Sequence, residues 1–180
     1  MSSPTPPSPH PFPGLQTPRL LLRLLTLEDT DAVYRHFSDD DVTRFMDIDA
    51  CTNVAQAREI IEFHLNDPGC RWGLFYKATG ALIGTCGYHC WERDLPQPMA
   101  EIGFDLGKAH WGQGLMHETL QTAIPFGFEQ MKLTKIYASV EPANHRSIRL
   151  LQRLDFRAEP GPRNGLRWFN LFRNQWTGPT

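Results

Sequence analysis

The feature of this sequence that most constrains its fold is a two-glycine turn placed directly before an amphipathic segment. Residues 110–116 read His-Trp-Gly-Gln-Gly-Leu-Met, and apolar residues then recur at helical spacing as far as Met131. A helix that begins here presents unpaired N–H groups and partial positive charge, and glycines let the main chain approach an anion closely. The turn is therefore either an anion site of the kind that holds a phosphate or an ordinary tight connection, which is the commoner explanation of such a turn alone.

Composition indicates a folded globular protein. The 180 residues are 41% hydrophobic and 21% charged, with a formal net charge of −2. This length is typical of one domain with a substantial core. The charge gives no general attraction to nucleic acid, and no apolar run approaches the roughly 20 residues of a membrane span. We therefore expect a cytoplasmic protein without a nucleic-acid or membrane partner, in which any anion site is built from local groups.

The N-terminal segment differs from the rest of the chain. Six prolines lie among Ser, Thr and His within the first 14 residues. The segment has neither the basic start nor the apolar centre of a secretory signal, and its composition is typical of a disordered, partly polyproline chain. We predict a disordered Pro-rich tail over residues 1–16 and a single domain over residues 17–180.

Hydrophobic periodicity divides this domain into short strands and helices. Strands are expected over 19–25, 72–77, 82–89, 99–106, 135–140, 156–158 and 166–173, and helices over 26–37, 53–66, 115–131 and 144–154. In the strand 99–106, apolar residues alternate with Glu101, Gly103 and Asp105, which face the other way. The order of elements predicts an α+β fold with a mixed, mostly antiparallel sheet of about six to seven strands, flanked by about four helices.

The run Cys86-Gly-Tyr-His89-Cys90 raises the question of a metal site. A regular strand would place residues 86 and 90 on one face and His89 on the other, and no second ligand pair has zinc spacing. We therefore expect no metal site, and free cysteines that belong to the core.

Five segments together, in this order and spacing, resemble the GNAT superfamily of acyl-CoA-dependent N-acetyltransferases, and more narrowly its branch of ribosomal-protein N-terminal acetyltransferases. They are Thr17–Arg23, Ala100–Phe104, Trp111–Met116, Asn144–Arg149 and Leu154–Phe156, and the resemblance extends over roughly residues 17–176. In the acyl-CoA motif of the family, Gly114 stands at the fixed glycine, Trp111 at the first position, as is frequent in this branch, and Met116 at the last, where the family has a smaller residue.

The resemblance implies a GNAT-like sheet that is splayed between the fourth and fifth strands, 99–106 and 135–140. Acetyl-CoA, the implied co-substrate, would place its pantetheine arm in that gap and its pyrophosphate on the main-chain N–H groups from Gly112 to His117. The implied cofactor-binding residues are Phe104, Leu106, Trp111, Gly112, Gln113, Gly114, Leu115, Met116, His117 and Asn144.

Acetyl transfer to an amine requires an unprotonated nitrogen, a polarised thioester carbonyl and a proton for the departing thiolate. Glu101, on the polar face of its strand, is the candidate base, and a solvated strand glutamate is the alternative. Many relatives carry a tyrosine acid where this chain has Leu151, so Ser147 is the candidate acid, against the alternatives of an ordinary first-turn serine or of thiolate departure without an acid. No cysteine is placed like a nucleophile beside a histidine, which favours direct attack in a ternary complex.

Other residues of the region have less defined roles. Arg146, Arg149 and Arg153 form a basic stripe that either meets the cofactor phosphates or is a solvated helix face. Tyr88 and Trp91 are candidates for a wall of the acceptor site. The side chains of His36, His64, His89, His117 and His145 have no acidic partner that the sequence reveals, and we assign them no role.

The sequence therefore predicts an acetyl-CoA-dependent N-acetyltransferase that acts on a primary amine, with the N-terminal α-amine of a protein or peptide favoured. Two alternatives stay open at this stage. One is acetylation of a small-molecule amine such as an antibiotic or polyamine, and the other is a non-catalytic acyl-CoA-binding module. The protein is expected to be a monomer or a homodimer.

Overall fold

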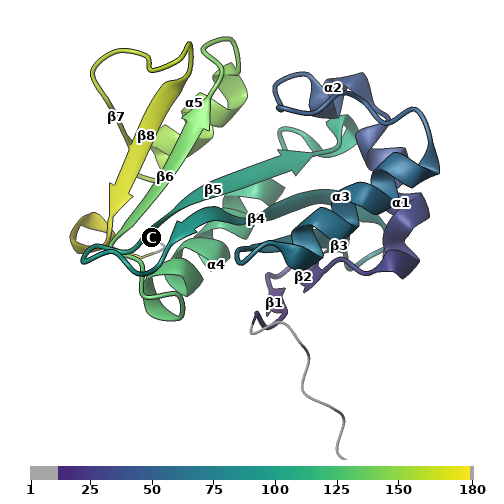
Figure 1. Cartoon of the computed structure of the whole chain (residues 1–180), viewed down its shortest axis with the longest axis horizontal. Coiled ribbons are helices and arrows are strands. Elements are labelled where there is room, and N and C mark those ends of the chain that lie inside the picture. Colours follow the sequence, from purple (N-terminus) through teal and green to yellow (C-terminus); the bar gives the residue numbers. More distant parts are fainter. Residues whose placement is uncertain (1–11, 179–180) are drawn as a thin grey trace, which may run out of the picture.

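The structure, a computed structural model, describes residues 12–178 and consists of one sheet with helices on both faces (Figure 1). The strands are β1 (Leu15–Gln16), β2 (Leu20–Leu24), β3 (Cys70–Tyr76), β4 (Leu82–Glu92), β5 (Met99–Leu106), β6 (Lys135–Val140), β7 (Arg157–Ala158) and β8 (Arg167–Phe172). The helices are α1 (Thr30–Phe37), α2 (Asp40–Thr43), α3 (Val54–Asn66), α4 (Leu115–Glu129) and α5 (His145–Arg153).

The strands lie in the order β1-β2-β3-β4-β5-β6-β8-β7, and every neighbouring pair is antiparallel except β5 and β6. The prediction of a mixed, mostly antiparallel sheet is confirmed. The sheet has one strand more than expected, because the two-residue β1 pairs with β2. The short helix α2 was also not predicted, since its four residues are too few to show a period.

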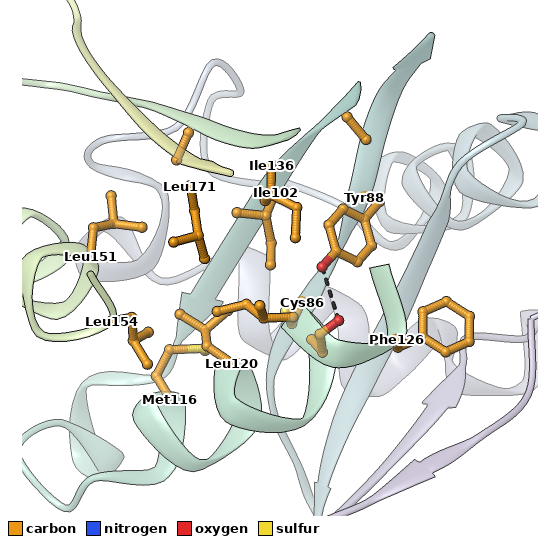
Figure 2. Close-up of a cluster of buried hydrophobic side chains, with 14 of the residues drawn as sticks. Cys86, Tyr88, Ile102, Met116, Leu120, Phe126, Ile136, Leu151, Leu154 and Leu171 are labelled. Atoms are coloured by element: carbon orange, nitrogen blue, oxygen red, sulfur yellow. Dashed lines mark hydrogen bonds between the residues drawn. The ribbon is translucent and has the colours of Figure 1, made fainter. Parts of the chain in front are cut away.

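The main core lies between the sheet and α4. Alternate residues of β4 and β5, including Cys86, Tyr88 and Ile102, are buried against the helix residues Leu120 and Phe126 (Figure 2). The Tyr88 hydroxyl donates a 2.9 Å hydrogen bond to the Ala123 carbonyl of α4. Since Tyr88 is fully buried and faces α4, its prediction as a wall of the acceptor site is wrong.

The opposite face of β5 meets α1 through polar groups. Asp105 is buried there and accepts from His36 of α1 (2.6 Å), from Arg71 of β3 (2.7 Å) and from Thr85 of β4. Burial alone would raise the pKa of Asp105, but the hydrogen bond with His36 and the charges of His36 and Arg71 hold it far below its usual value. A carboxylate that stays ionised thus joins three elements to the outer end of β5.

The parallel pair β5–β6 is very short. Its register joins Met99 to Lys135, Ala100 to Ile136 and Glu101 to Tyr137, and no further pair forms among the described residues although both strands continue. Figure 1 shows β6 and β8 leaning away from β4 and β5 beyond this point. The splay that the family resemblance implied between these strands is confirmed.

The end of the predicted tail belongs to the fold. Residues 1–11 lie outside the described residues, but the Phe12 ring packs against the rings of Trp91 and Phe126, and the Pro13 carbonyl accepts a 3.0 Å hydrogen bond from the Trp72 indole. Residues 12–16 therefore differ from the prediction of a disordered segment, because an aromatic anchor and β1 hold them. Trp91 packs on this N-terminal segment rather than standing free beside an acceptor site.

The expectation of core cysteines is wrong at one position. Cys51, Cys70 and Cys86 are buried, whereas Cys90 is exposed and has a positive φ of 50°. The register of β4 and β5 shifts between the pairs His89–Glu101 and Glu92–Met99, so two residues of β4 face one of β5. This β-bulge ends the regular alternation, and residues 86 and 90 therefore do not share a face.

Gly127 provides a test of the core between β4 and α4. A Cβ atom at this buried position would lie 2.5 Å from the Tyr88 hydroxyl, which is itself held by Ala123. We expect Gly127→Ala to lower the free energy of unfolding by about 1–3 kcal/mol, since overpacking outweighs the gain in helix propensity. Urea denaturation measures the change. At Gly107, an added Cβ would make only ordinary contacts of 3.4 Å or more, so Gly107→Ala is the matched control, and equal stability of the two variants would contradict the packing argument.

Candidate active site

The glycine turn begins α4 in the way that an anion site requires. Gly112 and Gly114 have φ values of 75° and 76°, in the left-handed region that favours glycine, and Gly114 is the N-cap residue. The first main-chain bond of the helix runs from the Glu118 N–H to the Gly114 carbonyl (3.0 Å). The N–H groups of residues 115–117 precede this bond, so they have no intrahelical acceptor and point out of the helix start.

Arg19, which directly precedes β2, fixes this turn from outside. Its main-chain N–H and its Nε donate to the two carboxylate oxygens of Glu118, at 2.9 and 2.8 Å, and its Nη1 donates to the Gln113 carbonyl at 3.0 Å. The Gln113 side chain turns back to the Ala109 carbonyl (2.9 Å). The side chain and carbonyl of Gln113 thus stabilise the turn, and the binding of cofactor by its main-chain N–H stays a prediction.

A cavity of about 670 Å³ lies beside the turn. It is bounded by the end of β5, the first turn of α4, the first turns of α5 and the chain that follows α2. It brings together the predicted cofactor-binding residues other than Gln113, together with the candidate acid: Phe104, Leu106, Trp111, Gly112, Gly114, Leu115, Met116, His117, Asn144 and Ser147.

The charge of the cavity wall suits a polyanion. The three arginines of α5 line it with Lys108 and with Arg44, which follows α2. The Arg146 guanidinium lies 3.8 Å from the centre of the Trp111 ring, so it bridges α5 to the glycine turn. Lys108 is partly neutralised by Asp41 at 2.7 Å. Arg44 was not predicted, because no pattern in the sequence links the segment after α2 to this site.

The main chain at the outer end of β5 faces the gap. The Gly107 N–H donates to the Ile83 carbonyl of β4. Main-chain groups of successive residues in a strand point alternately to its two neighbours, so the N–H and C=O groups of Phe104 and Leu106 point toward β6. The Leu106 carbonyl accepts a 2.7 Å hydrogen bond from the Trp111 indole. The main-chain groups of Phe104 therefore face the gap, and their binding of the cofactor stays a prediction, whereas the Leu106 carbonyl already has one partner.

Glu101 lies where the paired part of β5 ends. Its Oε1 accepts from the Ser139 N–H (3.1 Å) and from the Ser139 hydroxyl (2.5 Å), and its Oε2 lies 3.5 Å from Nε2 of His89. Burial would raise the pKa of Glu101, but the hydrogen bonds with His89 and Ser139 hold it below its usual value. The carboxylate is half-buried and ionised at neutral pH, and the hydrogen bonds of Ser139 to Oε1 fix its orientation.

The contacts of Glu101 with Ser139 and His89 were not predicted from the sequence. Ser139 follows the last paired residue of β6 by two positions, and His89 pairs with Glu101 across β4 and β5. The assignment of no partner to the histidines is therefore wrong for His89 and for His36, which contacts Asp105. Contacts between residues 12 or more positions apart leave no local pattern, and only the strand register could have indicated the pairing of His89.

Asn144 and Ser147 stand at the start of α5. The Asn144 side chain caps the helix by accepting from the Ser147 N–H at 3.2 Å, and both residues are half-buried in the cavity wall. The structure thus brings Ser147 to the cavity, and the cap uses its main-chain N–H rather than its hydroxyl. Glu101 lies outside the cavity lining, three residues before Phe104 on β5.

These groups together suit transfer of an acyl group from a phosphate-bearing thioester. The helix start and the arginines can hold phosphates, the open edge of β5 can hold an extended amide-bearing arm, and Glu101 can accept a proton where that arm would end. Among the described residues, no helix has both the length and the apolar character needed to cross a bilayer.

Comparison with known proteins agrees with this geometry. The family model described as an acetyltransferase (GNAT) domain matches residues 19–157. The uncharacterized N-acetyltransferase p20 of Bacillus licheniformis is 41% identical over 149 residues, which are 81% of this chain and 83% of that protein. The ribosomal protein uS5-alanine N-acetyltransferase of Escherichia coli is 30% identical over 170 residues, 90% of this chain and 85% of its own length.

Solved structures share the fold. A ribosomal L7/L12 α-N-protein acetyltransferase, RimL, in complex with coenzyme A superposes with a TM-score of 0.75 at 15% identity, over 88% of this chain and 97% of that one. The recognition of the GNAT family is confirmed by the family model and by these relatives, which include a ribosomal-protein N-acetyltransferase. The chain belongs to the GNAT family of acetyltransferases and is an acyltransferase.

Proposed function

We propose that this protein transfers the acetyl group of acetyl-CoA to a primary amine on a peptide, with an N-terminal α-amine preferred over a lysine side chain. The observation that carries the proposal is the position of Glu101, an ionised carboxylate held at the point where β5 and β6 separate. The phosphate-binding features lie at the far end of the same gap, so donor and base would meet where the gap closes.

The donor would be held by main-chain groups more than by side chains. The N–H groups of residues 115–117 would bind the pyrophosphate, and Arg146, fixed on Trp111, would approach it from α5. The main chain of Phe104 would pair with the pantetheine arm. The arm would then take the place that a neighbouring strand occupies in a continuous sheet. This arrangement delivers the thioester toward Glu101.

The acid–base chemistry then follows from the Glu101 geometry. The amine nitrogen attacks the thioester carbonyl, the C–S bond breaks, and the amine proton passes to Oε2 of Glu101 directly or through a water. A carboxylate whose pKa is lowered is a weak base. An α-amine, with a pKa of about 7.7–8.0, is partly neutral near pH 7, whereas a lysine, with a pKa of about 10.4, is not. A weak base therefore favours the α-amine.

Ser147 is the proposed donor of a proton to the departing thiolate, because its hydroxyl lies in the wall of the cavity. The relatives support the choice of acceptor, since one that is 30% identical is named as an alanine N-acetyltransferase of ribosomal protein uS5. A cytoplasmic location and a monomeric or homodimeric state stay predictions.

The first test concerns the donor site. Gly114→Val places a β-branched residue at a φ of 76°, which distorts the helix start. We expect acetyl-CoA affinity, measured by calorimetry, to fall at least tenfold, which is about 1.4 kcal/mol. Gly161→Val is the matched control, because Gly161 has a similar φ of 78° with open space around it and lies on a loop away from the cavity. Equal affinity in both folded variants would refute the placement of the donor.

The second test concerns the base and the acid. Glu101→Gln keeps the shape of the side chain but removes the charge, so we expect turnover to fall about a hundredfold or more with acetyl-CoA affinity nearly unchanged. Ser147→Ala should give a smaller loss, and no loss would favour thiolate departure without an acid. Glu129→Gln, an exposed change at the end of α4, controls for the loss of one carboxylate. A Glu101→Gln enzyme with the turnover of the Glu129→Gln control would make Glu101 structural.

The third test concerns the acceptor. Short peptides with free or blocked N-termini, some containing lysine, compete with polyamines and aminoglycosides for acetylation by the purified protein. We expect peptides with free N-termini to be acetylated first and blocked peptides that retain lysine to react much more slowly. Preferential acetylation of a polyamine or aminoglycoside, with peptides inert, would overturn the peptide acceptor but not the membership of the family.

A further inference from the structure

Three side chains of different chemistry converge beside the gap between β5 and β6. We propose that His89, Cys90 and Glu101 form a binding site for a divalent metal ion of the zinc class, and that an ion bound there inhibits the enzyme by occupying Glu101. The inhibition rests on the proposed role of Glu101 as the base, whereas the binding of metal does not.

The convergence is a consequence of the β-bulge in β4. In a regular strand, His89 and Cys90 would point to opposite faces, which is one of the two reasons that the sequence predicts no metal site. The bulge and the positive φ of Cys90 remove this alternation, so both side chains reach the same side as Glu101 of β5. A non-glycine residue in this conformation is strained, and such strain often marks a functional position.

The distances suit a small tetrahedral ion. One ligand atom from each residue, an imidazole nitrogen, the Cys90 sulfur and a Glu101 oxygen, lie within 4.8 Å of one another. Nε2 of His89 and Oε2 of Glu101 are 3.5 Å apart. A tetrahedral zinc ion with nitrogen and oxygen ligands about 2.0–2.1 Å away holds such atoms about 3.3–3.4 Å apart, so these two ligands need little movement, and the Cys90 sulfur is the ligand that would move toward the ion.

The donor set selects the class of metal. A thiolate and an imidazole favour zinc and its neighbours in the transition series, whereas calcium and magnesium require oxygen ligands. On binding, the Cys90 thiol loses its proton to solvent and the sulfur becomes a ligand. Three protein ligands leave a fourth position for water, and the exposed Cys90 gives the ion a route of entry.

Ser139 orients the Glu101 carboxylate so that one of its oxygens can act as a metal ligand. Ser139 occupies Oε1 of Glu101 with two hydrogen bonds, so Oε2 is directed toward His89. Partners of this kind raise the affinity of metal ligands. A metal ion on Oε2 would take the oxygen that the proposed reaction uses to accept the amine proton, which is why binding should inhibit.

Metal binding is tested with the metal-free full-length protein. Cobalt(II), a spectroscopic substitute for zinc, should give a thiolate-to-metal charge-transfer band that zinc abolishes, and zinc affinity is measured by competition with a chromophoric chelator. We expect Cys90→Ser and His89→Gln each to weaken zinc binding at least tenfold. Cys51→Ser and His145→Gln are matched controls, since Cys51 is buried elsewhere and His145 is exposed on α5. Absence of the band, or unchanged zinc affinity in Cys90→Ser, would overturn the site.

Inhibition is tested separately, as the fraction of each variant's own zinc-free turnover that remains when zinc is added. We expect zinc to inhibit the wild-type protein, a chelator to reverse the effect, and Cys90→Ser to require at least tenfold more zinc. Equal inhibition of the wild type and Cys90→Ser would overturn the inhibitory role. Saturable zinc binding by a wild-type protein that acetylates no amine would overturn the proposed function while supporting the metal site.

Discussion

The splay of β5 from β6 depends on a hydrogen bond in which a side chain replaces the main chain. The Ser139 N–H points toward β5, where the next step of a parallel ladder would offer it a main-chain carbonyl, but it donates to the Glu101 carboxylate instead. The Ser139 hydroxyl donates to the same oxygen. The ladder therefore ends at the pair of Glu101 with Tyr137, and the rest of β5 keeps an open edge.

An open edge leaves main-chain groups that need partners, since unpaired N–H and C=O groups are costly when buried. The chain satisfies the Leu106 carbonyl itself through the Trp111 indole and leaves Phe104 facing the cavity. Rigidity comes from the buried Asp105, which ties β5 to α1 and β3. Removal of one partner of a buried pair of this kind typically costs about 3–5 kcal/mol. The edge can therefore stay open without the strand becoming loose.

How much of this could be predicted from the sequence depends on the range of the interactions. The helices α3 and α4 and the strand β5 carry strong periodic patterns, so their positions and faces were predictable. The helix start at Gly114 was predictable because its chemistry is local. The bulge at Cys90 and the pair of His36 with Asp105 were not, since each depends on the register of strands or on residues 69 positions apart. The function of the site came from resemblance, because a lone strand glutamate has no local signal of its role.

The Glu101 carboxylate thus has a structural and a proposed chemical role, and each role uses a different oxygen. Oε1 accepts both Ser139 hydrogen bonds and so both ends the ladder and fixes the side chain. Oε2 is then the oxygen left for a proton, and it faces His89 across the sheet. Glu101→Gln keeps an oxygen that can accept the Ser139 hydrogen bonds, so it should remove the charge while leaving the gap open, whereas Ser139→Ala should loosen the orientation while leaving the carboxylate charge in place. The separation of these effects in Ser139→Ala and Glu101→Gln would therefore distinguish a base from a residue that only shapes the sheet.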